Sequence, residues 1–177
     1  TAGPVPRESL SDECEILVVG AGFAGLLLWY KLQAAGFVDV RFCEKGGDVG
    51  GTWYWNRYPG IACDVESYSY FPLLEEMGYV PSMKFASGFE IMEYCQQMAE
   101  KFNFYDRCLF HTTVEKTEWD DSSGRWTVHT DRGDAMKAGI KGKGYSTNID
   151  ASLKTLPPAP QGAVFDAEEQ SKYREFK

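Results

Sequence analysis

The sequence lacks the features that mark membrane and nucleic-acid-binding proteins. No apolar run approaches the roughly 20 residues that a membrane-spanning helix needs, and residues 1–13 are polar and proline-bearing, unlike a signal peptide. The net charge is −8 and no lysine and arginine cluster is present, whereas binding to a phosphate backbone needs a basic surface. We therefore expect no membrane partner, no nucleic-acid partner and a cytoplasmic location.

Metal ligands and nucleophile pairs are also scarce. The five cysteines are scattered and odd in number, without C-x-x-C spacing: Cys14, Cys43, Cys63, Cys95 and Cys108. This pattern predicts free, buried thiols, and it favours neither a disulfide framework nor a zinc site, so we expect no metal. The two histidines, His111 and His129, have no evident nucleophile or orienting group beside them, which disfavours a hydrolase triad.

A dinucleotide-binding pattern is the most informative feature that is present. The apolar run at residues 15–19 leads into Gly20-Ala21-Gly22-Phe23-Ala24-Gly25, a G-x-G-x-x-G motif. In such motifs the residue at Gly20 makes the turn out of the strand, Gly22 lets the backbone approach the phosphates, and Gly25 lets the helix pack on the sheet. The pyrophosphate then lies at the helix N-terminus.

The residues after the glycines complete the pattern. We predict a helix over about residues 23–35, ended by Gly36, and a second strand over residues 38–43 that closes on Glu44. An acidic residue at this point is placed to accept hydrogen bonds from ribose hydroxyl groups. A glycine-rich turn in an unrelated α/β protein remains an alternative, although strand, turn, helix, strand and acid all occur in order.

Residues 46–60 identify the motif more specifically. They run Gly-Gly-Asp-Val-Gly-Gly-Thr-Trp-Tyr-Trp-Asn-Arg-Tyr-Pro-Gly, with a Cys63-Asp64 pair shortly after. Many glycines and aromatics predict a loop wrapped over a flat object, although core or surface aromatics would give the same composition. The run closely resembles the FAD domain of Baeyer-Villiger flavoprotein monooxygenases, and the resemblance covers about residues 14–135.

The resemblance implies a set of site residues. It places Gly51, Thr52 and Trp53 along the flavin, and Val114 near the adenine side of FAD. The aspartate at the Asp64 position orients an arginine that stabilises the flavin peroxide in the family, so Asp64 is the catalytic candidate; a loop-capping aspartate is the alternative. The predicted FAD-binding residues are Gly20, Gly22, Phe23, Ala24, Gly25, Glu44, Lys45, Gly51, Thr52, Trp53, Asp64, Tyr70 and Val114.

The second half of the matching region predicts a helix and a meander. Ser87-Gly88-Phe89-Glu90 is a capping box that opens a helix to about Phe104, with Phe89 among its core positions. Strands are predicted at residues 108–110, 112–119 and 125–130, which together suggest a small β-meander over about residues 108–136. The fold class is therefore α/β, a Rossmann-like FAD-binding domain of the two-dinucleotide-binding flavoprotein type with a β-meander.

The chain also departs from the family. There is no second G-x-G-x-x-G for NADPH and no downstream F-x-G-x-x-x-H-x-x-x-W fingerprint, and the glycine-lysine run at 137–144 does not match the strand that the family places there. We predict an N-terminal extension at 1–13, a partial FAD-binding domain at 14–140, and a linker with an appended segment at 141–177. NADPH would need a site from a missing domain or partner, through a homo-oligomer or a complementing chain.

Three functions are compatible with these observations. The first is the FAD-binding part of a Baeyer-Villiger monooxygenase, which inserts oxygen from a flavin peroxide next to a small hydrophobic ketone and gives an ester or lactone, with NADPH as reductant. The second is a truncated non-redox relative, an isomerase, cyclase or binding module for a hydrophobic metabolite. The third, an NAD-dependent dehydrogenase, fits the glycines and Glu44 but not the aromatic run.

Overall fold

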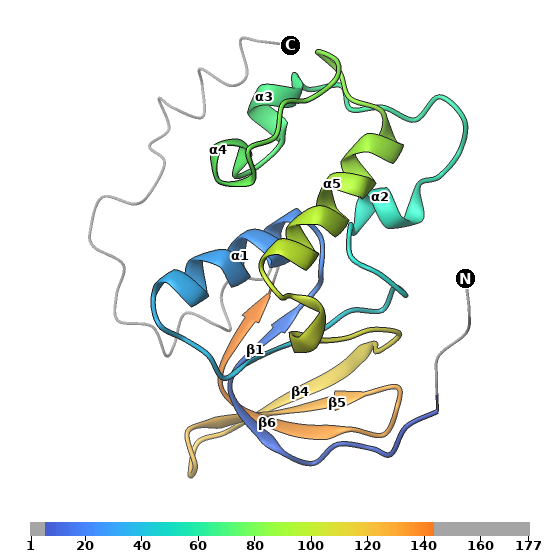
Figure 1. The fold of residues 1–177 in the computed structure, drawn as a ribbon. Coiled ribbons are helices and arrows are strands. Elements are labelled where there is room, and N and C mark those ends of the chain that lie inside the picture. Colours follow the sequence, from blue (N-terminus) through green and yellow to red (C-terminus); the bar gives the residue numbers. More distant parts are fainter. Residues whose placement is uncertain (1–5, 144–177) are drawn as a thin grey trace, which may run out of the picture. The chain divides into compact units, whose positions relative to one another are not determined.

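The computed structural model describes residues 6–143, which build one six-stranded sheet with its main helices against one face (Figure 1). The strand order is β3-β2-β1-β6-β5-β4. The strands are β1 (Glu13–Val19), β2 (Val40–Cys43), β3 (Cys108–Leu109), β4 (Val114–Asp120), β5 (Arg125–Thr130) and β6 (Ala135–Lys143). The helices are α1 (Phe23–Ala34), α2 (Thr52–Trp55), α3 (Ser67–Tyr70), α4 (Leu74–Met77) and α5 (Gly88–Lys101), with a 3₁₀ turn at Tyr105–Arg107. The predicted α/β class is confirmed.

The β1–α1–β2 unit forms as predicted because its signals are local. The backbone turns at Gly20, whose φ of 105° is favourable only for glycine, and α1 follows directly. Trp29 of α1 is buried against Phe42 of β2, with ring centroids 6.3 Å apart, and its indole N–H donates to the carbonyl of Phe102. This contact fixes α1 across the sheet.

Two apolar clusters cover the two faces of the sheet. Successive strand residues point to opposite faces, so Ile16 and Val18 of β1 join the cluster under α1 and α5, while Leu17 packs on the other side. That second cluster includes Val128 and Met136 from the antiparallel strands. The cysteines are free, and all but half-buried Cys108 are buried.

Helix α5 begins at the predicted cap but differs from the prediction in two details. Ser87 Oγ accepts from the backbone N–H of Glu90 at 3.2 Å, which is half of a capping box. The Glu90 carboxylate instead accepts from Tyr79 Oη and from Ser82, so the reciprocal bond is replaced. Phe89 is 63% exposed, which corrects its assignment to the core; the buried face carries Ile91, Tyr94, Cys95, Met98 and Ala99.

The predicted meander is shifted along the chain. Residues 108–109 form β3, which pairs in parallel with β2 and is therefore not part of the meander. The antiparallel strands are β4, β5 and β6, and β6 also pairs in parallel with β1 over residues 137–143. Residues 137–143, whose sequence does not match the strand that the family places there, nevertheless form most of β6, and β6 joins the meander to the Rossmann-like half.

The N-terminal residues are anchored to this junction. The Arg7 guanidinium donates from both terminal nitrogens to Asp134, at 2.6 and 2.7 Å, and the Leu10 N–H donates to the same carboxylate. Thr130 Oγ1 donates to Asp134 as well, and Asp134 is 1% exposed. Apart from the end of β6, the predicted linker and appended segment at 141–177 lie outside the described residues.

Candidate functional site

A cavity of about 870 Å³ opens where β1 and β2 end and α1 begins. In open α/β sheets ligands bind in the crevice beyond the carboxyl ends of the strands, and a volume of roughly 300–1,000 Å³ is typical of small-molecule sites. The cavity is lined by Val19, Gly20, Gly22, Phe23, Ala24, Gly25, Leu27, Cys43, Glu44, Lys45, Gly50, Gly51, Thr52, Trp53, Trp55, Tyr70, Pro72, Thr112, Thr113 and Val114.

The N-terminus of α1 presents hydrogen-bond donors to this cavity. Gly22 is the N-cap and supplies no side-chain cap, and the first turn contains no acidic residue. The first N–H groups of a helix have no partner within the helix and carry its positive dipole end. Because Gly22 and residues 23–25 line the cavity, this end fits an anion such as a pyrophosphate.

Glycine occupies positions 25 and 22 of the motif for different structural reasons. A Cβ at Gly25 would lie 2.2 Å from the Gly20 carbonyl oxygen, so the protein itself requires glycine there. Gly22 has a φ of −78°, and its Cβ would lie 3.5 Å from Gly51 Cα, an ordinary contact. The fold therefore tolerates a side chain at position 22, and the space that it would fill belongs to the cavity.

Glu44 is held at the end of β2 with its carboxylate facing the cavity. It is 6% exposed, and its two oxygens accept from the backbone N–H groups of Ala21 and Gly46, at 2.8 and 2.6 Å. A carboxylate has about four lone-pair positions, so these two bonds leave acceptor capacity for a ligand hydroxyl. The hydrogen bonds from Ala21 and Gly46 thus fix the orientation of the Glu44 carboxylate, and with it the direction from which a ligand hydroxyl can donate to it.

Aromatic side chains form another part of the cavity lining. Trp53 of α2 is buried and donates from Nε1 to Tyr70 Oη at 3.0 Å, while Phe23 contacts the Tyr70 ring edge-on at 5.6 Å. Burial raises the pKa of Tyr70, so its hydroxyl keeps its proton at neutral pH. The loop prediction for residues 46–60 is modified here, because Thr52–Trp55 form one helical turn.

All the predicted FAD-binding residues except Asp64 line this cavity. Asp64 is exposed on the loop before α3, and its charge adds to the effect of burial in raising the pKa of Tyr70. The predicted roles remain predictions. Burial raises the pKa of Cys43 to about 12, so this thiol is neutral and is not a nucleophile for the cavity.

The sequence interpretation missed several lining residues. Gly50 and Trp55 lie inside the glycine-aromatic run and could have been included on that signal. Thr112 and Thr113 directly precede Val114, and the N–H of Thr112 donates to the Glu44 carbonyl, a contact between distant residues. Nothing in the local sequence indicates Pro72.

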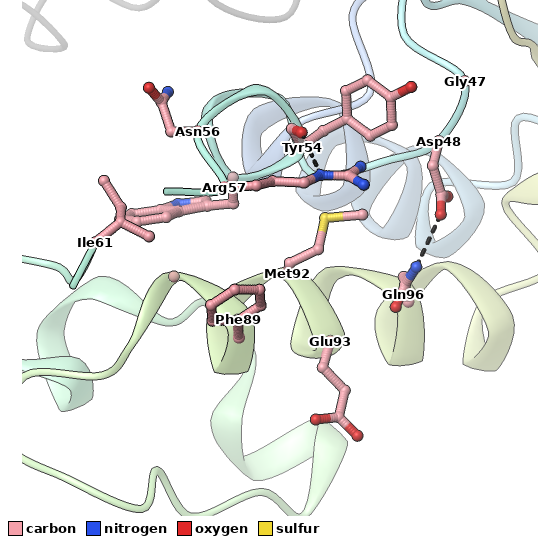
Figure 2. A pocket seen from close by; sticks show the side chains of 12 residues that line it. Gly47, Asp48, Tyr54, Asn56, Arg57, Ile61, Phe89, Met92, Glu93 and Gln96 are labelled. Atoms are coloured by element: carbon pink, nitrogen blue, oxygen red, sulfur yellow. Dashed lines mark hydrogen bonds between the residues drawn. The ribbon is translucent and has the colours of Figure 1, made fainter. Parts of the chain in front are cut away.

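A second cavity, of about 520 Å³, lies between α2 and α5 (Figure 2). Arg57 crosses it: its Nε donates to the Tyr54 carbonyl at 2.6 Å, and the guanidinium stacks on the Tyr54 ring at 4.4 Å. Asp48 accepts from the Gln96 side chain at 2.8 Å at one end of this cavity. Trp53 lines both cavities and forms a wall between them.

Neither a membrane-spanning helix nor a metal-binding cluster occurs among residues 6–143. None of the helices in that range is long and apolar enough to cross a membrane. Within the same range, no three or more His, Cys, Asp or Glu side chains are grouped so that they could hold a metal ion.

The chain matches known proteins over most of its length. Residues 18–80 match the family model of an NAD(P)-binding Rossmann-like domain. Neopentalenolactone D synthase of Streptomyces avermitilis is 51% identical over 157 residues, which are 88% of this chain and 26% of the relative. A Baeyer-Villiger monooxygenase of Streptomyces coelicolor is 51% identical over 132 residues, 75% of this chain and 22% of the relative.

Solved structures agree with these relatives. The polycyclic ketone monooxygenase of Thermothelomyces thermophila superposes with a TM-score of 0.73 at 37% identity, over 79% of this chain and 24% of that one. OTEMO in complex with FAD and NADP superposes with a TM-score of 0.69 at 31% identity, over 73% and 25%. The chain thus spans about a quarter of the length of these proteins. Over that quarter it belongs to the Baeyer-Villiger monooxygenase family, as a partial relative with a Rossmann-like domain.

Proposed function

We propose that this chain is the FAD-binding part of a Baeyer-Villiger-type monooxygenase that converts a small hydrophobic ketone into an ester or lactone, with NADPH as reductant. The observation that carries the proposal is the cavity at the start of α1, in which uncapped helix N–H groups, side-chain-free Gly22 and the oriented Glu44 carboxylate come together. The similar protein OTEMO has been solved in complex with FAD and NADP.

Different groups of the cavity would bind different parts of FAD. The N–H groups at the start of α1 would hold the pyrophosphate, and Glu44 would accept from ribose hydroxyls. The aromatic lining formed by Phe23, Trp53 and Tyr70 would exclude water from the flavin end. When bound, FAD supplies the redox and oxygen chemistry, and the protein supplies orientation and electrostatics.

Asp64 keeps its proposed role as the residue that orients an arginine of the complete enzyme. Asp64 is exposed in the described part of the chain, as expected of a side chain whose arginine partner belongs to another segment of the complete enzyme. The NADPH site, a homo-oligomer or complementing chain, and the cytoplasmic location also remain proposals, since the chain covers about a quarter of its relatives.

The first test is FAD binding by the purified protein. After incubation with FAD and removal of the excess, we expect a flavin absorption spectrum in stoichiometric amount. A folded protein without retained flavin would contradict the proposal and favour the non-redox alternative. Binding of NAD in preference to FAD would favour the dehydrogenase.

The variant Gly22→Ala makes this test specific to the cavity. Its methyl group meets only an ordinary contact at Gly51, and alanine is a poorer N-cap than glycine, so we expect the stability to fall by less than about 1 kcal/mol. Overpacking a close-fitted site costs about 1–3 kcal/mol, which corresponds to roughly 5- to 150-fold weaker FAD binding. Titration of FAD fluorescence measures the affinity. Equal affinity of both proteins would show that the cofactor does not approach position 22.

A further inference from the structure

The loop between β2 and α2 has only two side chains over residues 46–51 that can hold it in place. These residues run Gly-Gly-Asp-Val-Gly-Gly, and Gly50 and Gly51 have φ angles of 110° and 53°, which disfavour any residue except glycine. A glycine backbone also loses more conformational freedom on becoming ordered than that of any other residue. The position of the loop therefore depends on the side chains of Asp48 and Val49.

This loop contributes backbone to the larger cavity, of about 870 Å³. Gly50 and Gly51 line that cavity, and the Gly50 N–H donates to the Ala21 carbonyl at 2.9 Å. A Cβ at Gly22 would lie 3.5 Å from Gly51 Cα, so the loop lies directly beside the helix end that fits a pyrophosphate. A shift of the loop would therefore change the shape of the cavity where the phosphates of FAD are expected.

Asp48 anchors the loop through both of its carboxylate oxygens. Oδ1 accepts from the Val49 backbone N–H at 2.7 Å and from Tyr105 Oη at 3.0 Å. Oδ2 accepts from Gln96 Nε2 of α5 at 2.8 Å, as Figure 2 shows. The Asp48 side chain lines the second cavity and not the larger one, so it would affect a bound cofactor through the backbone of the loop rather than by direct contact.

Helix α5 supports the same loop at two further points. A Cβ at Gly50 would clash with Met92 Sδ, so glycine at this position lets the loop pack closely on the helix. Val49 is fully buried in the apolar cluster that also contains Ile91 of α5. The helix itself is capped at Ser87 and buried along one face, so it provides a fixed support for the loop.

We propose that Asp48 is a positioning residue, which joins residues 46–51 to α5 and to the 3₁₀ turn and so holds the backbone of Gly50 and Gly51 in the place that FAD requires. This inference rests on the proposed function and adds the residue that orders the loop before the cofactor binds. A loop that is ordered in advance loses little conformational entropy on binding. Because Asp48 and the FAD pyrophosphate are both negatively charged, the contribution of Asp48 comes from its hydrogen bonds and not from its charge.

The test compares the FAD affinities of Asp48→Ala and Asp48→Asn. Alanine removes all the bonds of the carboxylate, so the loop must become ordered when FAD binds. Ordering the backbone of one residue costs about 1–2 kcal/mol, which predicts roughly 5- to 30-fold weaker binding. Asparagine keeps an oxygen that accepts from Val49 and Tyr105, and the Gln96 amide can turn so that its oxygen accepts from the new NH₂ group. We therefore expect Asp48→Asn to bind FAD nearly as tightly as the wild type.

Gln96→Ala tests the same contact from the side of α5. Alanine is favourable within a helix, so the fold should be retained. The variant loses one of the bonds to Asp48, and we expect its FAD binding to weaken less than that of Asp48→Ala. The double variant should bind no more weakly than Asp48→Ala, because Gln96 acts through Asp48. Additive losses in the double variant would overturn this connection between α5 and the loop.

Glu93→Ala is the matched control for charge. Glu93 is an exposed residue of α5 that lines the same second cavity, and it forms no hydrogen bond or ion pair with any of residues 6–143. The variant removes one negative charge from this cavity and leaves the anchor of the loop intact, so we expect wild-type FAD affinity. If Glu93→Ala or Asp48→Asn lost as much affinity as Asp48→Ala, charge would be responsible and the positioning role would be overturned.

A measurement without cofactor separates this inference from the proposed function. In the ligand-free protein, the Gly50 amide should exchange with solvent faster in Asp48→Ala than in the wild type, and at the wild-type rate in Asp48→Asn. Amides of β1 should keep their protection in all variants, which distinguishes a local loosening of the loop from a general loss of stability. If the wild type binds no FAD, the proposed function fails, whatever the exchange rates show. If FAD binds but the Gly50 amide exchanges equally in Asp48→Ala, only the present inference fails.

Discussion

Replacing Gly25 by alanine is expected to destabilise the protein by more than the same change at Gly22, where the added methyl group would meet only an ordinary contact. The new Cβ would lie 2.2 Å from the Gly20 carbonyl oxygen and 3.1 Å from its carbon. Both are backbone atoms, so no side-chain rotation relieves the clash, and α1 must move off β1. Overpacking costs about 1–3 kcal/mol and more where backbone shifts, against a total stability of about 5–15 kcal/mol.

Chemical denaturation followed by circular dichroism measures this effect. We expect a lower midpoint for Gly25→Ala, and loss of FAD binding along with it. Gly22→Ala is the matched control, because it adds the same methyl group three residues earlier on the same helix terminus, where the fold has room. If the two variants were equally stable, the close packing of α1 on the turn would be disproved.

Replacing Asp134 by asparagine is expected to lower the free energy of unfolding by about 1.5–3 kcal/mol, the usual contribution of a hydrogen bond to a charged group, because the buried Asp134 carboxylate is paired with the partly exposed Arg7 guanidinium. Asp134 is 1% exposed and accepts from Arg7, Leu10 and Thr130. Asparagine keeps the shape but loses the charge and one acceptor oxygen. Urea unfolding curves measure the difference.

The pH dependence of this effect has a definite sign. The hydrogen bond from Arg7, in spite of burial, holds the pKa of the Asp134 carboxyl well below its usual range. A depressed folded-state pKa contributes stability that is fully present above the unfolded value of about 4 and is lost as the pH falls below it. The stability difference between wild type and Asp134→Asn should therefore be constant above about pH 5 and shrink below about pH 4.

An exposed pair provides the control for both measurements. Glu66 and Lys84 are 2.8 Å apart, but their side chains are 57% and 65% exposed. Such surface pairs contribute about 0–1 kcal/mol, so Glu66→Gln should hardly change the unfolding midpoint. An equally small effect of Asp134→Asn would mean that Arg7 does not anchor the N-terminal residues.

The parts of the fold that could be predicted from the sequence are those with local signals. The strand, turn, helix and acid of residues 13–44 are encoded within one continuous stretch, and the cap at Ser87 depends only on Glu90 three residues later. The cavity lining followed from the same stretch together with the family resemblance. The exposure of Phe89 and of Asp64 could not be predicted, because the burial of a side chain depends on which distant parts of the chain pack against it and not on its neighbours in sequence.

Strand β6 shows why the remainder was missed. Its glycines and lysines do not look like an interior strand, although Met136, Ala138 and Ile140 alternate with polar or small residues. What stabilises it is pairing with β1 and β5, and close approach at Gly139, where a Cβ would lie 3.2 Å from the Glu15 carbonyl oxygen. Long-range pairing of this kind leaves only a weak trace in local sequence.

The position of β1 between β2 and β6 also sets an order for folding during synthesis. β1 can pair with β2 soon after both leave the ribosome, but its other edge pairs with residues 137–143, about 120 residues later in the chain. At roughly 5–20 residues per second, residues 137–143 are synthesised about 6–25 s after β1. During this interval the second edge of β1 is unpaired and can pair with other strands, and pairing with β6 then closes it.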